Sequence, residues 1–299
     1  GYLYHAKTAD FAKIPGSPIA YWVSKAIIDA FNRNIYLESI VDTAVGLFTC
    51  NNDRYLRFWH EVQIEKIGFN YSTRKDALDS GKKYFPYNKG GGYRPWYGLN
   101  ELIVNFKNDG KEVREYRQAS GQSYSLPGET FYFREGITWS GLTSSYNSFR
   151  YADCGFVFES NKGQMLFCDS SSKYSILAFL NSFVVRHIIE IINPTLSLQS
   201  NEIKKIPVFL SQSFRDEITE KLVFLSRQDW DNFETSWDFQ THPLLRHNTP
   251  SLAQAFTNWH QQSETAFAEL KRLEEENNRY WIEAYGLQTE LSPEVPDAQ

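Results

Sequence analysis

The chain has few cysteines, no long apolar run and no secretory signal. Cys50, Cys154 and Cys168 are scattered, and no histidine stands beside them at metal-ligand spacing, which argues against a disulfide framework and against a zinc site. The longest apolar stretch, residues 176–192, is interrupted by polar and charged side chains and falls short of the roughly 20 residues that a membrane span needs. We therefore expect a cytoplasmic protein with no membrane partner. The chain does not open with a basic segment followed by an apolar one, so we expect no secretory signal, and its first residue is not Met, which indicates a processed product or an excised fragment.

The short motifs of the common catalytic folds are also missing. The sequence contains no G-x-S-x-G elbow, no G-x-x-x-x-G-K-[ST] loop, no H-E-x-x-H pair and no G-x-G-x-x-G after a strand. The six histidines lie far apart, and His187 sits in an apolar helical pattern that favours packing or capping over metal binding. We therefore expect no catalytic residue, no metal and no cofactor in this chain. A self-contained enzyme is the least favoured class of function.

Cations are concentrated in one part of an otherwise acidic chain. The net charge of the 299 residues is −5. Between Arg54 and Arg94, however, nine Lys and Arg face four Asp and Glu, whereas the stretch after His260 is acidic. Such a local excess of positive charge attracts a phosphate backbone, so this basic run indicates contact with nucleic acid.

The pattern of apolar residues and turns predicts an α+β fold, with a strand-rich centre flanked by helices. Residues 1–39 form a helical segment, in which Ser17-Pro18 starts a helix. Residues 40–210 carry short apolar runs separated by turns that contain glycine or proline. Residues 211–286 are helical, and residues 287–299 form a tail with little structure.

Within the strand-rich centre, apolar runs predict strands at 103–106, 130–133 and 155–158. Helices return from Ser172, first over 174–192. The last helix opens at Thr249-Pro250, ends at Gly286 and carries a heptad seam. The seam consists of Phe256, Trp259, Ser263, Ala266, Leu270, Leu273, Asn277, Tyr280 and Ala284. It either packs on the chain's own helices or pairs with a partner.

The stretch from Tyr84 to Gly98 interleaves three consecutive glycines with two cations and several aromatic rings. Glycines let a backbone approach a bulky partner, Lys and Arg bind phosphate or a base edge, and rings offer stacking surfaces. The stretch is either a nucleic-acid contact loop or a glycine-rich turn between two aromatic strands. The predicted contact residues are Lys89, Gly90, Gly91, Gly92, Tyr93, Arg94, Trp96 and Tyr97.

Two further stretches are rich in hydrogen-bond donors. Ser, Thr and Asn are typical partners of phosphate, and Arg of phosphate or guanine. The first stretch offers Thr49, Asn52, Arg54 and Arg57. The second offers Arg134, Thr138, Trp139, Ser140, Ser144, Ser145 and Arg150. The alternative is that both are ordinary surface turns.

Taken in chain order, these motifs resemble the C-terminal, target-recognition part of the PglX family, the adenine-specific DNA methyltransferases of BREX phage-defence systems. The motifs are Gly46–Thr49 with Asn52 and Leu56-Arg57, Tyr87–Gly98, Asn105–Gly110, Tyr132–Ser140, Glu269–Arg279 and Ala284–Gln288. They cover nearly the whole chain. Cys50 is a departure, because related recognition domains tend to carry a glycine in that turn.

The resemblance implies a catalytic part that this chain lacks. Members of the family have an N-terminal domain that binds S-adenosylmethionine and carries an Asn-Pro-Pro-Tyr-type motif. The nearest string here, Asn193-Pro194-Thr195-Leu196, lacks the second proline and the aromatic ring. The resemblance thus implies a segment that is inactive alone and recognises double-stranded DNA for the methyltransferase domain of the same parent chain.

The order of a strand-rich block before a long helix is also similar to the specificity subunits of type I restriction systems. The alternative function is a protein-interaction module that docks other BREX subunits or a phage-encoded inhibitor.

Overall fold

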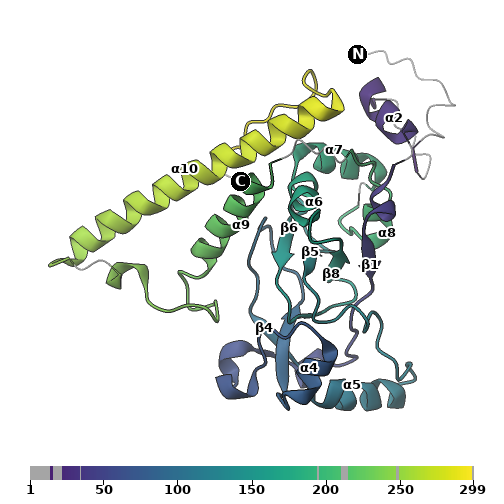
Figure 1. Ribbon diagram of the computed structural model, residues 1–299, viewed down its shortest axis with the longest axis vertical. Helices are drawn as coiled ribbons and strands as arrows, with labels where there is room; N and C mark the ends of the chain where they lie inside the picture. Colours follow the sequence, from purple (N-terminus) through teal and green to yellow (C-terminus); the bar gives the residue numbers. More distant parts are fainter. Residues whose placement is uncertain are drawn as a thin grey trace.

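Two four-stranded sheets and a set of helices make up the fold, which confirms the predicted α+β class (Figure 1). The computed structural model describes residues 14–15, 22–33, 35–193, 195–209, 215–246 and 249–297. The long C-terminal helix, drawn in yellow in Figure 1, extends away from the sheets at one end. The predicted helix start at Ser17-Pro18 lies outside the described residues, and the described helix begins after the N-cap Ser24.

The first sheet is antiparallel, in the order β1-β8-β5-β6. Its strands are β1 (Asp42–Ala44), β5 (Gly136–Ser140), β6 (Phe149–Ala152) and β8 (Gly163–Phe167). Every residue of β5 and β8 is buried, because the sheet has structure on both faces. The helix α6 (Lys173–Leu180) packs on β5 and β6, and its apolar side chains extend the main core.

The second sheet has the order β2-β4-β3-β7 and an aromatic core of its own. Its strands are β2 (Leu56–Phe58), β3 (Tyr84–Asn88), β4 (Leu102–Asn105) and β7 (Val157–Phe158), and only the β3–β7 pair is parallel. Edge-to-face contacts join Phe85, Phe106 and Phe133, the geometry that aromatic pairs prefer. The helices α4 (Arg74–Asp79) and α5 (Lys107–Ala119) lie at this end of the molecule (Figure 1).

The remaining helices lie around the first sheet or extend from it, except the short α3 (Asn52–Tyr55), which packs on β2 of the second sheet. They are α2 (Lys25–Asn32), α3, α7 (Phe183–Ile192), α8 (Ser200–Lys204), α9 (Asp216–Trp230) and α10 (Leu252–Tyr285). The predicted end of the last helix is confirmed, since Gly286 terminates α10 in a left-handed conformation with φ 70°. Among the described residues no single helix is long and apolar enough to cross a membrane, and only α6 and α7 taken together, bent by 63°, have the length and composition.

Three local predictions were wrong. Residues 130–133 form turns rather than a strand, and Phe133 has a φ of 70° that a strand cannot contain. The helix α5 lies in the region predicted as strand-rich and was not predicted itself, because its mainly polar sequence buries just one narrow face, with Val113, Arg114 and Arg117. The helix expected over 174–192 is broken at Asn181-Ser182, since Ser182 caps the start of α7.

The predicted seam of α10 packs within the chain over its C-terminal half. Leu273 and Asn277 are buried there, together with Trp281, which contacts Phe179 of α6. The N-terminal half is mostly exposed, and Phe256 and Phe267 each keep more than half of their surface accessible. One half of the helix therefore belongs to the core, while the other half extends from it.

We predict that Leu273→Ala lowers the free energy of unfolding by about 2–5 kcal/mol, because it leaves a cavity in the core. The matched control, Phe256→Ala on the exposed half of the same helix, should change stability by no more than about 0.5 kcal/mol. Urea unfolding followed by circular dichroism measures both. Equal effects of the two substitutions would contradict the division of α10 into a packed and an exposed half.

Candidate nucleic-acid interface

The glycine-rich loop (residues 89–95) lies where the two sheets meet. Gly90 has a φ of 76°, and a Cβ atom there would lie 2.0 Å from the Lys162 carbonyl oxygen, in the turn between β7 and β8. The Gly91 N–H donates to Ser140 Oγ of β5 at 2.9 Å. Gly90 is therefore required for backbone packing, whereas Gly91 and Gly92 are exposed.

Arg94 fastens this loop to α9. Its guanidinium donates to Asp229 at 2.8 Å and to the Ser226 carbonyl at 3.2 Å, and lies over the Trp230 ring. Its Nε donates to the Tyr97 carbonyl at 2.9 Å. These partners use the donors that a guanine contact would need, so in this structure Arg94 positions the loop.

Several predicted contact side chains are buried and cannot reach a ligand in this structure. They are Thr49, Trp96, Tyr97, Thr138, Trp139, Ser140 and Arg150, each at most 3% exposed. The indole N–H groups of the two tryptophans show the reason, because Trp96 donates to Glu274 of α10 at 2.6 Å and Trp139 to the Leu198 carbonyl at 3.0 Å. Apart from Arg150, these side chains are therefore part of the packed interior and not of an accessible surface.

Arg150 is a buried cation without a carboxylate partner among the described residues. Its closest acceptors are the Arg94 carbonyl and Ser140 Oγ, both at 3.5 Å, and its Nε has no partner. Burial, together with the nearby Arg94 charge, lowers the pKa of Arg150 to about 10. A buried charge without a counterion is costly, and this one lies beneath the glycine-rich loop, next to Trp96.

The first predicted contact stretch, residues 49–57, lies against α5. Thr49 donates to Asn52 Oδ1 at 2.7 Å, and the Arg57 guanidinium donates to two backbone carbonyls. Cys50 has a φ of 60°, the left-handed conformation that suits the glycine expected in related domains. Of the predicted contacts in this stretch, Asn52 and Arg54 remain exposed.

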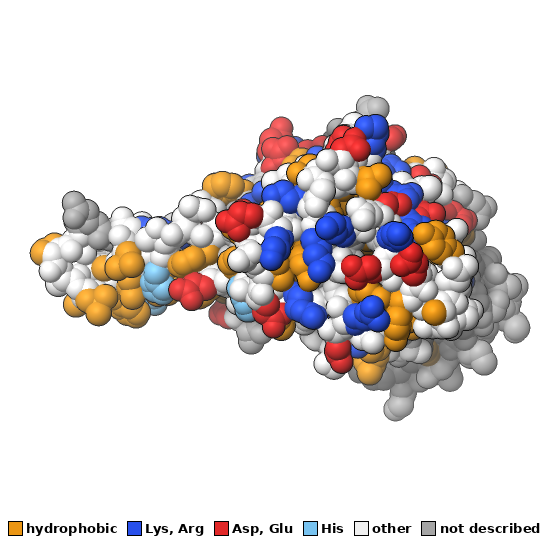
Figure 2. Space-filling model, turned by 90° about the horizontal axis from the view of Figure 1, so that it is seen from below, with side chains coloured by type: hydrophobic (Ala, Val, Ile, Leu, Met, Phe, Trp, Pro, Cys, Tyr) orange, Lys and Arg blue, Asp and Glu red, His pale blue; other side chains and the backbone are white. Residues whose placement is uncertain are grey.

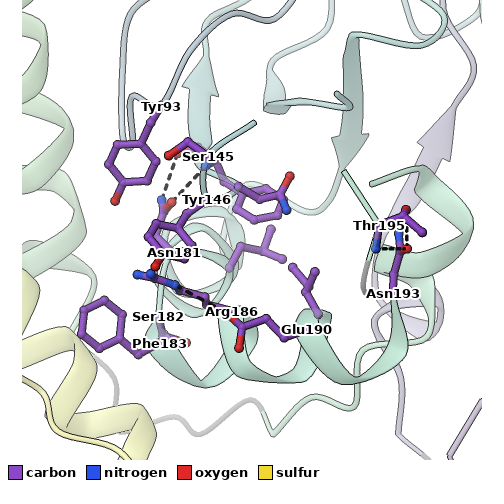
Figure 3. A pocket seen from close by; sticks show the side chains of 14 residues that line it. Tyr93, Ser145, Tyr146, Asn181, Ser182, Phe183, Arg186, Glu190, Asn193 and Thr195 are labelled. Carbon is purple, nitrogen blue, oxygen red and sulfur yellow. Dashed lines mark hydrogen bonds and ion pairs between the residues drawn. The ribbon is translucent and has the colours of Figure 1, made fainter. Parts of the chain in front are cut away.

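The structure does bring two predicted stretches together. The serine-rich loop (residues 141–148) joins β5 to β6, and its Ser145 lines a cavity of about 300 Å³ together with Tyr93 of the glycine-rich loop. Arg186 and Phe183 of α7 complete this side of the cavity, as Figure 3 shows. Sequence reasoning missed both α7 residues, although an arginine in an apolar helix was a usable signal. Ser144 is also exposed.

Arg134 is exposed at a different place, where it lies over the rings of Phe131 and Phe167. No group of three or more His, Cys, Asp or Glu side chains in the described part of the chain is arranged to hold a metal ion.

The predicted basic run separates into paired and unpaired cations. Arg74, Lys75 and Arg94 form ion pairs with Asp109, Asp79 and Asp229. A second set forms no ion pair with any described residue, and we call it the lysine surface. It consists of Lys66, Lys82, Lys83 and Lys107.

Backbone contacts hold the lysine surface together. The Lys83 N–H donates to the Lys66 carbonyl at 3.1 Å, and the Phe106 N–H, directly before Lys107, donates to the Lys83 carbonyl at 2.9 Å. Figure 2 shows Lys and Arg side chains gathered on the end of the molecule that α4 and α5 form, with fewer acidic side chains between them. This end can therefore attract an anionic partner.

Comparison with known proteins identifies relatives over nearly the whole chain. It is 38% identical over 306 aligned positions, 99% of this chain, to the adenine-specific methyltransferase PglX of Lacticaseibacillus casei (strain Zhang). The chain matches part of an adenine-specific methyltransferase. It is also 34% identical over 289 positions, 95% of this chain, to the adenine-specific methyltransferase BrxX of Escherichia coli O9:H4 (strain HS).

The predicted resemblance to PglX is thereby confirmed. The chain spans 25% of the length of PglX and 22% of that of BrxX, so it corresponds to about a quarter of these proteins. No protein-family model matches it.

We predict that Arg150→Met maintains or increases stability, because an apolar side chain of similar length removes the cost of a buried unpaired charge. Duplex DNA binding should not change, since the side chain is not accessible. Urea unfolding and fluorescence anisotropy with labelled duplex test the two parts. A loss of stability above about 1 kcal/mol would show that the 3.5 Å contacts of the guanidinium compensate the cost of burying its charge. Weaker DNA binding would show that Arg150 takes part in the DNA contact after all.

Proposed function

We propose that this chain recognises a target sequence in double-stranded DNA for an adenine-specific methyltransferase of a BREX phage-defence system. The catalytic domain, with S-adenosylmethionine as its cofactor, belongs to the parent protein outside this chain. Two observations support this division. The matched relatives are named adenine-specific methyltransferases and are about four times longer than the chain, and the motifs for cofactor and base binding are absent from its sequence.

The lysine surface is the observation that carries the DNA proposal. A lysine without a carboxylate partner is free to replace a counterion at a DNA phosphate, which gives affinity without sequence preference. Lys89 and Lys162 add two cations beside the glycine-rich loop, and neither forms an ion pair within the described residues. Phosphate contacts at both places would set the register of a duplex on the protein.

Base recognition would then come from the exposed parts of the predicted stretches. Gly91 and Gly92 present an accessible backbone that allows close approach. Tyr93 and Ser145 line the same cavity, and Ser144 precedes Ser145 in the chain. This set is shorter than the one predicted from sequence, because the buried members of that set are not accessible in this structure.

We predict that the chain binds duplex DNA with a logarithmic salt slope of about −4 to −5, if about four to six phosphates are contacted. The double variant Lys66→Gln/Lys83→Gln should make this slope shallower by about 2, because each lysine accounts for about 0.9. Anisotropy titrations over a series of KCl concentrations measure the slopes.

The matched control is Lys205→Gln/Lys221→Gln, which removes two exposed lysines outside this surface. An equal change of slope in both double variants would show that only overall charge matters, which contradicts a defined lysine surface.

The second candidate function, a protein-interaction module, is favoured by the exposed half of α10. Leu252, Phe256 and Phe267 are 70%, 55% and 51% exposed on one helix. Exposed apolar side chains of this size suit a protein partner. DNA binding that does not respond to salt, or no binding at low salt, would favour this function over the first.

We also predict that the chain alone transfers no methyl group from labelled S-adenosylmethionine to duplex DNA. The physical reason is that it lacks the motif that holds the base amino group near the cofactor. A radiolabel filter assay over a mixture of random-sequence duplexes measures transfer, with a complete methyltransferase as positive control. Sequence-dependent incorporation by this chain would contradict the assignment of catalysis to another part of the parent protein.

A further inference from the structure

The cavity beside α7 is larger than the buried voids of an ordinary core and opens to the surface. It has a volume of about 300 Å³, and a second hollow of about 670 Å³ continues from it along Tyr93, Tyr146 and Arg186. Binding sites for small molecules begin at about 300 Å³. The space therefore admits a ligand of nucleotide size.

Three aromatic rings from three separate elements border this space. Tyr93 comes from the glycine-rich loop, Tyr146 from the serine-rich loop and Phe183 from the first turn of α7. Figure 3 shows the rings of Tyr93 and Phe183 on the same side of the cavity, with the guanidinium of Arg186 between them. None of the three rings is buried, and Tyr146 is 47% exposed. Accessible rings around a hollow are suited to stacking on a planar ligand.

Arg186 is the cation that lines the cavity, while Glu190 lines it as well and Glu294 lines the second hollow. Arg186 lies over the Tyr146 ring, and its carboxylate neighbour Glu190 is 3.9 Å away, longer than a hydrogen bond. Burial lowers the pKa of Arg186, which indicates that its surroundings do not fully stabilise the charge. Ser182 and Phe183 at the start of α7 also line the cavity, and the Phe183 N–H donates to Asn278 Oδ1 at 3.0 Å.

One residue of the cavity lining also has a buried polar atom without a partner among the described residues. The side-chain oxygen of Asn147 is buried and has no hydrogen-bond partner, and Asn147 lines the cavity. A buried acceptor without a donor costs free energy.

We propose that this cavity binds a single nucleotide, with its phosphate on Arg186 and its base between the rings of Tyr93, Tyr146 and Phe183. The proposal extends the proposed function, because a nucleotide that leaves the stack of bound DNA is one source of such a ligand. A free mononucleotide is the other source. Both share a planar base and a phosphate, which match the rings and the arginine.

The test measures binding of deoxyadenosine monophosphate to the 299-residue chain by isothermal titration calorimetry. Deoxyadenosine, which lacks the phosphate, and deoxyribose 5-phosphate, which lacks the base, should each bind at least about tenfold more weakly. N-acetylphenylalanine offers a ring and a carboxylate instead. Equal binding of this compound would indicate a peptide site and overturn the proposal, as would no binding of the mononucleotide.

Two variants with opposite expected effects on binding separate a phosphate-binding role of Arg186 from a purely structural one. Arg186→Gln should weaken mononucleotide binding about tenfold or more, because a charge-assisted hydrogen bond is lost. Glu190→Gln should strengthen it, since the competing carboxylate charge is removed. The matched control is Arg33→Met, an arginine that also lies over an aromatic ring, Phe209, but outside the cavity. Should Glu190→Gln and Arg186→Gln both weaken binding, or Arg33→Met weaken it as much as Arg186→Gln, the proposed phosphate position is wrong.

A short oligodeoxyadenylate identifies the source of the nucleotide. Tighter binding of the oligonucleotide than of the mononucleotide, again lost in Arg186→Gln, points to a strand, whereas equal binding points to a free nucleotide. The outcome is separable from that of the proposed function. Duplex binding without any mononucleotide or oligonucleotide binding would overturn this inference alone, and mononucleotide binding without duplex binding would overturn the proposed DNA recognition alone.

Discussion

Close backbone packing at three glycines is the constraint on which the arrangement of this protein depends. A Cβ atom at Gly90 would lie 2.0 Å from the Lys162 carbonyl, one at Gly141 2.0 Å from the Asn161 carbonyl, and one at Gly163 2.3 Å from the Asn88 carbonyl. Only glycine permits such distances. The glycine-rich and serine-rich loops are thus held against one turn, between β7 and β8, and Tyr93 meets Ser145 as a result.

Polar contacts then fasten this junction to the helices. Arg94 binds Asp229 of α9, and Trp96 donates to Glu274 of α10. Burial raises the pKa of the Glu274 carboxyl, while the bond from the Trp96 indole acts in the opposite direction. Side-chain donors of Arg94 and Trp96 therefore connect this segment to both long helices. A shift of α10 would displace Trp96, and with it the adjoining glycine-rich loop.

The accessible chemistry is divided between two places. The end of the molecule with α4 and α5 offers lysines that form no ion pair with a described residue, whereas the cavity at α7 offers rings and one arginine. A long polyanion can use both kinds of contact, since charge supplies affinity and rings supply a place for single bases. This division is the physical basis of the proposed DNA recognition. The contribution of the lysine surface can be measured by the salt dependence of binding, and that of the cavity by the binding of nucleotides and their fragments.

The sequence by itself determined the fold class, the last helix and the family resemblance, because these follow from local patterns. The seam and the Gly286 stop are local signals, and they predicted the end of α10 to the residue. The predicted basic run also contained the members of the lysine surface other than Lys107.

Only the tertiary structure decided which polar residues remain accessible. Arg94 and Arg150 look alike in a loop-rich sequence, yet Arg94 binds Asp229 of α9, whereas Arg150 is buried with no carboxylate partner among the described residues. Arg186 was overlooked, because it stands in a mainly apolar helix and its partner ring, Tyr146, lies 40 positions away. Burial and long-range contacts depend on which surfaces meet after folding, and that depends on packing between segments that no local pattern records.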